Sequence, residues 1–173
     1  MLALNIGSQS EDWRARLLSN FAGTPFIIDD HHMASVEGFI QGIKYPEDHP
    51  NRARAFASDG YEAKRYGFKW SLVKIQKTSL AGRSMLGKVQ RQTKFVWWNG
   101  VAIPYGSAEH HALIERATRE KFNQNPEATE ALLATGTLTI THDLGRPESP
   151  HTSLPAAIFC DILTKIRQEA AGS

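Results

Sequence analysis

Hydrophobic positions follow two different periods along the chain, and these periods predict where strands and helices lie. An apolar segment opens the chain at Leu2–Ile6, and short apolar runs at Phe26–Asp29 and Leu138–Thr141 have the length of strands. Over Phe95–Ile103, apolar residues flank Asn99-Gly100, which is the preferred two-residue turn of a β-hairpin. We therefore expect a few short strands that are well separated in the sequence.

The longer segments have the helical period, in which apolar residues recur three or four positions apart. The predicted helices span Ser35–Lys44, Arg52–Tyr66 with a break near Asp59-Gly60, Ser107–Asn123, Pro126–Ala134 and Leu154–Glu169. Strands and helices do not alternate regularly, so the pattern favours an α+β fold over a doubly wound sheet. We expect one compact domain over residues 1–173 that is mostly helical and has a small mixed sheet.

Composition narrows the class of protein. The chain has 173 residues, of which 41% are hydrophobic and 22% charged, as is typical of a globular domain. Its single cysteine, Cys160, excludes an internal disulfide. No apolar run approaches the ~20 residues of a membrane helix, and residues 1–7 lack the basic start of a secretory signal. The sequence thus predicts a cytoplasmic protein with no membrane partner.

Positive charge is concentrated in one segment, although the net charge of the whole chain is only +2. Residues 64–94 contain nine Lys or Arg residues and no Asp or Glu. One interpretation is a solvated surface. The other is a basic lip that meets a phosphate-bearing substrate or a nucleic acid.

The helix predicted from Ser35 carries the clearest candidate chemistry. Glu37 and Lys44 share a face beside its apolar stripe, about 10 Å apart along the axis, so they do not readily pair with each other. Two interior glycines, Gly38 and Gly42, each cost roughly 1 kcal/mol relative to alanine. Such a cost is typical of a helix that another backbone or a ligand approaches closely.

Two interpretations of Glu37 and Lys44 remain open. In the first, both are solvated residues beside a packed core, and neither is needed for folding. In the second, they grip one ligand in a cleft, and the pair suits chemistry at a sugar C1. A carboxylate activates water or stabilises an oxocarbenium ion, and a lysine with a pKa lowered by burial forms a Schiff base with an aldehyde-like carbon.

The helix predicted from Ser107 has two polar residues, His110 and Lys121, within its apolar arc. They are either a core histidine and a lysine whose ammonium reaches solvent at the helix end, or part of the same cleft. In the cleft, Gly106-Ser107 would offer free backbone N–H groups to a phosphate. The sequence has no His-Glu-x-x-His motif or other metal-ligand spacing, so we expect no metal.

Several motifs occur together in one order along most of the chain. They are Leu18-Ser19-Asn20-Phe21, Pro25-Phe26, the whole of Ser35–Lys44, Ala63-Lys64-Arg65-Tyr66-Gly67, Lys121-Phe122-Asn123-Gln124-Asn125, Leu132-Leu133-Ala134-Thr135-Gly136 and Ile166-Arg167. In this order they resemble the YbiA-like or NADAR (NAD- and ADP-ribose-associated) family. Among them, the Ser-x-Glu…Lys helix is the most specific.

The resemblance implies a single α+β domain that cleaves N-glycosidic bonds without a metal or redox cofactor. Some family members remove damaged riboflavin-pathway intermediates, and others release ADP-ribose from guanine bases. Glu37 and Lys44 correspond to the family's catalytic pair, with Lys44 as the nucleophile towards ribose C1. Asn20 and Phe21 match a motif implied to contact substrate. The expected substrate is a nucleotide, or an ADP-ribosylated small molecule or nucleic acid.

The last third of the chain departs from the family pattern. Residues 143–153 lack the family's Trp, and His142 stands near the position of a family Glu. Tyr105 can stack on a base in place of a missing Trp, and His110 and Asp143 are further candidates for base or ribose contacts. Because of these departures, two alternatives stay open: a module that binds ADP-ribose or NAD without turnover, and a nucleic-acid-binding protein that uses residues 64–94.

Overall fold

The computed structural model describes residues 2–78, 81–82, 84–90 and 92–173, and for 72–78 and 84–90 it describes the backbone. The described helices are α1 (Trp13–Leu18), α2 (Val36–Gly42), α3 (Pro50–Phe56), α4 (Gly60–Ser71), α5 (Ala108–Gln124), α6 (Pro126–Leu133) and α7 (Ala156–Ala171). The described strands are β1 (Ala3–Asn5), β2 (Phe26–Ile28), β3 (His31–Met33), β4 (Leu72–Thr78), β5 (Ser84–Gln90), β6 (Phe95–Trp98), β7 (Val101–Pro104) and β8 (Thr139–Thr141).

The strands pair two by two, so the α+β class is confirmed with four separate two-stranded sheets in the described part of the chain. The first strand, β1, pairs in parallel with β8 near the other end of the sequence. The pairs β2–β3, β4–β5 and β6–β7 are antiparallel hairpins. The predicted Asn99-Gly100 turn joins β6 to β7, and both of its residues have positive φ, as a type I′ turn requires.

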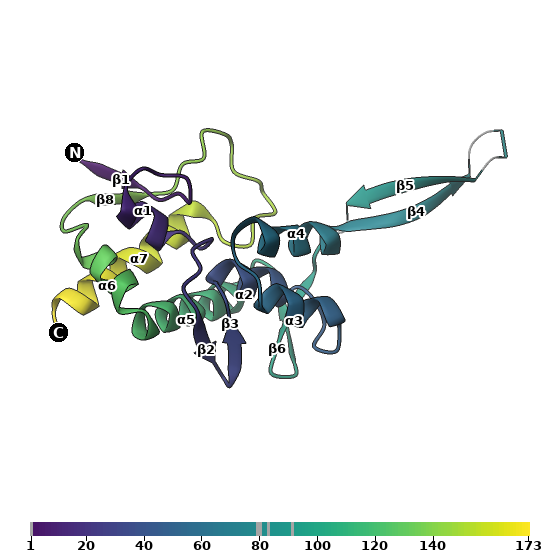
Figure 1. Ribbon diagram of the computed structural model, residues 1–173. Coiled ribbons are helices and arrows are strands. Elements are labelled where there is room, and N and C mark those ends of the chain that lie inside the picture. The colour runs from purple at the N-terminus through teal and green to yellow at the C-terminus, as the bar shows by residue number, and fades with distance from the viewer. Residues whose placement is uncertain (1, 79–80, 83, 91) are drawn as a thin grey trace.

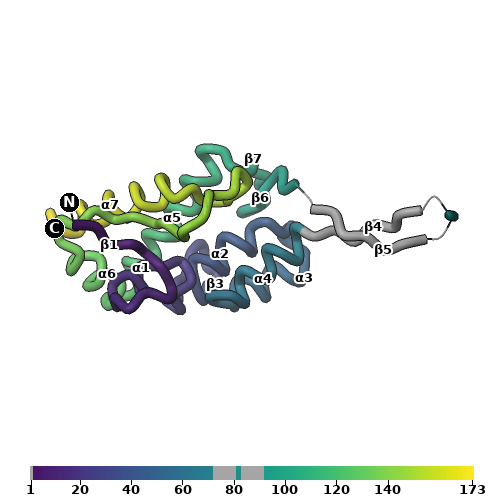
Figure 2. Tube along the Cα trace, turned by 90° about the horizontal axis from the view of Figure 1, so that it is seen from above, coloured from purple at the N-terminus to yellow at the C-terminus, as the bar shows by residue number. Residues whose placement is uncertain are grey.

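Two hydrophobic cores share one long helix. The first core combines α1, α6, α7 and the β1–β8 pair, and it includes Phe122 near the end of α5. The second combines α2, β2, β3 and β6 with Leu113, Ile114 and Ala117 from the first half of α5. Figures 1 and 2 show both termini at the end of the molecule formed by the first core, with α2, α3 and α4 beyond it.

Every residue of α2 is buried, because α3 packs directly on its glycines and α4 also packs against the helix. A Cβ atom added at Gly38 would lie 2.5 Å from the carbonyl oxygen of Ala55, and one added at Gly42 would lie 2.3 Å from the ring of Phe56. These separations are too short for any side chain, so the two glycines are explained by the close approach of α3. The predicted role of the glycines is confirmed.

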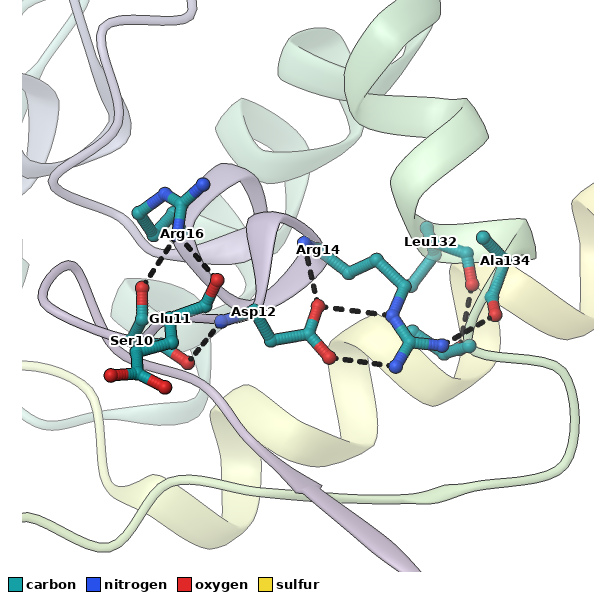
Figure 3. A network of polar contacts seen from close by, with 8 residues as sticks. Ser10, Glu11, Asp12, Arg14, Arg16, Leu132 and Ala134 are labelled. Carbon is teal, nitrogen blue, oxygen red and sulfur yellow. Dashed lines mark hydrogen bonds and ion pairs between the residues drawn. The ribbon is translucent and has the colours of Figure 1, made fainter.

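The sequence did not predict α1, which contains only six residues. Hydrogen bonds to residues outside the helix hold it in place (Figure 3). Its N-cap, Asp12, accepts hydrogen bonds from the backbone N–H of Arg14 at 2.9 Å and from the Arg14 guanidinium. The same guanidinium donates to the carbonyl oxygen of Ala134 at 2.9 Å, just after α6. Arg14 therefore ties the start of α1 to the end of α6.

The other differences from prediction are local. The predicted break near Asp59-Gly60 is confirmed, since it separates α3 from α4. Strands β3, β4 and β5 were not predicted. No described helix combines the length and the apolar character that crossing a membrane requires.

Candidate functional site

The N-terminus of α2 is built as the sequence predicts. The Ser35 side chain accepts the backbone N–H of Gly38 at 2.9 Å, which caps the helix, and donates to the carbonyl oxygen of Ser58 at 2.9 Å. The helix places Glu37 in its first turn, and Lys44 follows directly after its last turn. One ionisable side chain therefore stands near each end of a helix that is fixed by a cap and by close packing.

Both side chains are buried, so the interpretation of Glu37 and Lys44 as solvated residues is wrong. Glu37 is 7% exposed and Lys44 is 9% exposed. The helical period places them beside the apolar stripe, but α3, α4 and the segment around Asn20 cover the flanks of that stripe as well. The two groups form no ion pair with each other within 4.0 Å, as their spacing along the helix predicts.

Burial changes the proton affinity of both groups in opposite directions. It raises the pKa of the Glu37 carboxyl, although the hydrogen bond from Gln41 and the electrostatic effects of Lys64, Lys44 and His142 oppose that rise. Burial lowers the pKa of the Lys44 amine to about 8, against an opposing effect of Glu37. The site therefore favours a protonated acid and a neutral amine more than water does.

Gln41 is a member of the site that sequence reasoning missed. Its Nε2 donates to Glu37 Oε1 at 2.8 Å, and its Oε1 is buried without a hydrogen-bond partner. The side chain lies against Gly67 of α4, where an added Cβ would be 1.9 Å from Gln41 Oε1. The available signal was its place one turn after Glu37 on the same helix.

Lys64 and His142 also act on Glu37 electrostatically, and neither was predicted as a site residue. Lys64 lies on α4 with its Nζ 5.4 Å from the ring centroid of Phe21. His142 follows β8, and its Nδ1 lies 3.0 Å from the carbonyl oxygen of Ile6. Both residues stood in the sequence at positions noted for the family motifs, but only the fold brings them to Glu37.

Asn20, predicted to contact substrate, lies beside the catalytic candidate. Its carbonyl oxygen accepts the backbone N–H of Glu37 at 2.9 Å, while its side-chain Oδ1 is buried without a hydrogen-bond partner. Phe21 is half-buried and lines a hollow of about 440 Å³ together with Trp13 and Leu17. The Asn20-Phe21 segment therefore borders the Glu37 end of α2, where its unsatisfied amide oxygen is free to accept a hydrogen bond.

Lys121 holds this segment in place and does not reach solvent, so of the two interpretations of this residue, the one with a solvated ammonium is wrong. The side chain is 1% exposed, and its Nζ donates to the carbonyl oxygens of Leu17 at 2.6 Å and Ser19 at 2.9 Å. These carbonyls end α1, which has too few residues to satisfy them itself. Lys121 therefore supports the backbone just before Asn20.

The Lys44 end of α2 faces Tyr105 and the start of α5. Lys44 Nζ lies 6.0 Å from the ring centroid of Tyr105, and that ring lies 5.0 Å from the ring of His110. Burial lowers the pKa of His110 to about 4, with His111 and Lys44 adding to the effect. His110 is fully buried and accepts the N–H of Gly106 on Nδ1 at 3.0 Å, and its Nε2 has no partner.

The suggestion that Gly106-Ser107 offers free N–H groups to a phosphate is wrong. The N–H of Gly106 donates to His110, and the N–H of Ser107 donates to the carbonyl oxygen of Pro104. The local turn therefore already uses both donors.

Asp143 lies apart from the residues gathered around Glu37. Its side chain is exposed, and Oδ1 accepts the backbone N–H of Gly145 at 2.8 Å. Its own backbone N–H and carbonyl oxygen are both bonded to the Asn5 side chain. This is the arrangement of an aspartate that stabilises its own turn, and it leaves the neighbouring His142 as the residue of this loop that acts on Glu37.

The predicted basic lip falls largely outside the described side chains. Its residues beyond them are Lys74, Lys77, Arg83, Lys88 and Arg91. Of the remaining four cations, Lys64 belongs to the Glu37 environment and Lys69 lies 4.5 Å over the ring of Tyr66. Within the part of the chain that the structure describes, no three His, Cys, Asp or Glu side chains gather as metal ligands would.

Comparison with known proteins supports the family resemblance. Residues 12–168 match the model of a family described as bacteriophage protein GP30.3. An uncharacterized 17.1 kDa protein from the Gp30-rIII intergenic region of Enterobacteria phage T4 is 30% identical over 156 residues, which cover 90% of this chain and 91% of that protein.

The NMR structure of the E. coli protein YbiA superimposes on the fold. The TM-score is 0.62 at 19% sequence identity, and the match covers 98% of this chain and 85% of that one. The YbiA-like resemblance predicted from the motifs is thus confirmed, and this likeness establishes the fold.

Proposed function

Because the chain belongs to the family of bacteriophage protein GP30.3 and has the fold of YbiA, we propose that it is an N-glycosidase. The proposed substrate is an ADP-ribose-type or nucleotide N-glycoside, including ADP-ribose attached to a guanine base. One observation carries the proposal: a buried carboxyl with a raised pKa and a buried amine with a lowered pKa stand near the two ends of one helix, without pairing. Perturbed groups of this kind are typical of catalytic sites.

The chemistry follows from these two groups. The bond from the sugar C1 to the base nitrogen breaks, the base takes a proton from water, and the neutral Lys44 amine adds to C1 and gives up one proton to the hydroxide that is left. Protonated Glu37 then gives its proton to the ring oxygen as the C1–ring oxygen bond opens to a protonated Schiff base. Water hydrolyses this Schiff base, which releases the sugar, restores the neutral amine and returns a proton to the Glu37 carboxylate.

Asn20 and Gln41 fit roles beside this pair. Both carry a buried amide oxygen without a partner, and an unsatisfied buried acceptor costs roughly 1–3 kcal/mol. Sugar hydroxyls are donors of matching chemistry. The positive charge of Lys64 near Glu37 suits the phosphate of a nucleotide.

The test traps the Schiff base. The protein is incubated with ADP-ribosylated guanosine, ADP-ribosylated DNA or NAD in the presence of borohydride, and its peptides are analysed by mass spectrometry. We expect a reduced sugar adduct on the peptide that contains Lys44 and on no other lysine. Because the pKa of Lys44 is about 8, the fraction of neutral amine rises about tenfold per pH unit below that value. The kcat/KM should rise with this fraction and fall again where the Glu37 carboxyl loses its proton, so the pH profile should be bell-shaped.

Two variants complete this test. Lys44→Ala should lose turnover and adduct, whereas Lys165→Ala, which removes a half-exposed lysine paired with Asp161, should keep both. Turnover by the parent protein without an adduct, together with full activity of Lys44→Ala, would exclude the proposed mechanism.

A further inference from the structure

A hollow of about 520 Å³ opens at the Lys44 end of α2. Three segments distant in sequence form its walls: the start of α5, the loop over residues 148–155, and residues 92–93 just before β6. Its volume is that of an ordinary small-molecule site. Lys44 lies in its wall, so a molecule bound there would contact the proposed nucleophile directly.

Tyr105 presents a fixed aromatic ring in this hollow. Its hydroxyl donates to the carbonyl oxygen of His151 at 2.7 Å and lies 2.9 Å from the Ser153 Oγ, and both partners belong to the 148–155 loop. The hydroxyl is thereby used to orient the ring. A planar side chain held in this way stacks on a planar ligand with little loss of conformational freedom.

His111 supplies an unsatisfied polar group in the same wall. Its Nε2 is buried and has no hydrogen-bond partner, although the residue lines the hollow. A buried ring nitrogen without a partner is costly, and a heteroatom on a ligand would satisfy it. A nitrogen heterocycle provides such heteroatoms in the plane of its ring.

The side-chain charges near the two ends of α2 differ, so each end suits a different part of a substrate. The hollow is lined by one carboxylate, Glu148, which also accepts the backbone N–H of Ala156 at the start of α7 at 2.7 Å. A carboxylate disfavours a phosphate. The Glu37 end has Lys64 nearby, which favours one.

We propose that the hollow binds the leaving base of the substrate, an aromatic nitrogen heterocycle of the purine type. The base stacks on Tyr105 and bonds to His111, while the sugar C1 lies between Lys44 and Glu37 and the phosphate side extends towards Lys64. This inference rests on the proposed N-glycosidase function and identifies which end of the site receives the product base.

Free hypoxanthine is the probe, because its binding does not depend on turnover. Calorimetric titration of the whole chain should give saturable binding that Tyr105→Leu weakens ~5-fold or more, as loss of a base–aromatic stack does. Tyr105→Phe should retain most of the affinity, and His111→Ala should lose part of it. Trp13→Leu, which removes the aromatic ring from the hollow beside Phe21, is the matched control and should bind as the parent does.

The outcomes separate the two proposals. Binding lost in Tyr105→Leu but no turnover of any N-glycoside would support the base site and reject the enzyme. Turnover with unchanged hypoxanthine inhibition in Tyr105→Leu and His111→Ala, or weakened binding in Trp13→Leu alone, would overturn the base site. No saturable binding at millimolar hypoxanthine would overturn it as well. If Tyr105→Leu fails to fold, His111→Ala decides the question.

Discussion

The two ends of α2 differ in how tightly their ionisable side chains are surrounded. At the Glu37 end, Gln41 donates to the carboxyl, the Asn20 carbonyl oxygen accepts the backbone N–H of Glu37, and Lys64, Lys44 and His142 act on the carboxyl electrostatically. At the Lys44 end, the amine borders an open hollow, and its Nζ lies 6.0 Å from the centroid of the Tyr105 ring in the wall of that hollow. An acid–base group must be held in one geometry to transfer a proton, whereas a nucleophile that releases a base needs space beside it.

Both ends of α2 also contain buried polar atoms without hydrogen-bond partners, which lower the stability of the fold. The Glu37 end contains two unsatisfied amide oxygens, and the Lys44 end contains two unsatisfied imidazole nitrogens, those of His110 and His111. Most buried polar groups in proteins are paired, so four exceptions around one helix mark a region shaped for a ligand rather than for stability alone.

The largest effect is expected when the Glu37 carboxyl, the acid at the tightly held end of α2, is replaced by an amide. Glu37→Gln keeps the size of the side chain and its acceptor for Gln41, so the free energy of unfolding should not fall. Turnover of the N-glycoside should drop by about 100-fold or more, because the proton donor to the sugar ring oxygen is lost. Melting curves and single-turnover kinetics measure the two effects.

Glu109→Gln is the control for this change, since Glu109 is an exposed carboxylate in the first turn of α5. It should retain parental kinetics. Parental turnover in Glu37→Gln would show that the fixed end of the helix has no acid–base role.

A second change tests whether Gln41 positions Glu37, because it displaces the Gln41 side chain without mutating it. In Gly67→Ala, the new methyl group would overlap Gln41 Oε1, so the amide must turn away and release Glu37. We expect about a tenfold loss of kcat and a shifted pH profile, because the carboxyl loses the hydrogen bond that opposes its raised pKa.

Gly7→Ala is the matched control, because an added Cβ there meets nothing within 4 Å. An unchanged pH profile in Gly67→Ala at reduced kcat would mean that α4 merely moved. Such a result would remove Gln41 from the positioning of Glu37.

The smallest effect concerns the support behind the Glu37 end. Lys121→Met removes the donor to the carbonyl oxygens of Leu17 and Ser19, and the free energy of unfolding should fall by roughly 1–3 kcal/mol. Burial lowers the pKa of Lys121 to about 7, while an unfolded lysine titrates near about 10.4. Between these values the unfolded chain binds more protons, so this group makes stability rise with pH.

The loss in Lys121→Met should accordingly be larger at about pH 9 than at about pH 6, as denaturant titrations at the two pH values would show. Lys165→Met, at a half-exposed position, serves as the control. An equal loss at both pH values would mean that Lys121 keeps its ordinary pKa in the folded chain.

The sequence was sufficient to find the helix with Glu37 and Lys44, because spacing on a helix fixes which residues share a face. It was not sufficient to establish their burial. The flanks of α2 are covered by α3 and α4, and the sequence pattern of one helix does not show which other helices pack against it. The glycines gave the only hint, because they indicate a close approach without naming the partner.

Residues that join the site through tertiary structure show the same limit. His142 reaches Glu37 because β8 pairs with β1, a contact across nearly the whole chain that no local pattern reveals. Strands β4 and β5 pair residue by residue from Leu72↔Gln90 to Thr78↔Ser84, yet their apolar positions are interrupted by cations. Charge dominated the interpretation of that segment, and the strand period beneath it was overlooked.

The continuous helix α5 contributes residues to both hydrophobic cores, and this affects how the protein unfolds. The first half of α5 belongs to one core and Phe122 near its end belongs to the other, while Leu154 packs against both. Helix formation is cooperative along its length, so melting either core exposes a helix that the other requires. We therefore expect the two cores to unfold as a single cooperative unit, and the arrangement of Glu37 and Lys44 to be lost in that same transition.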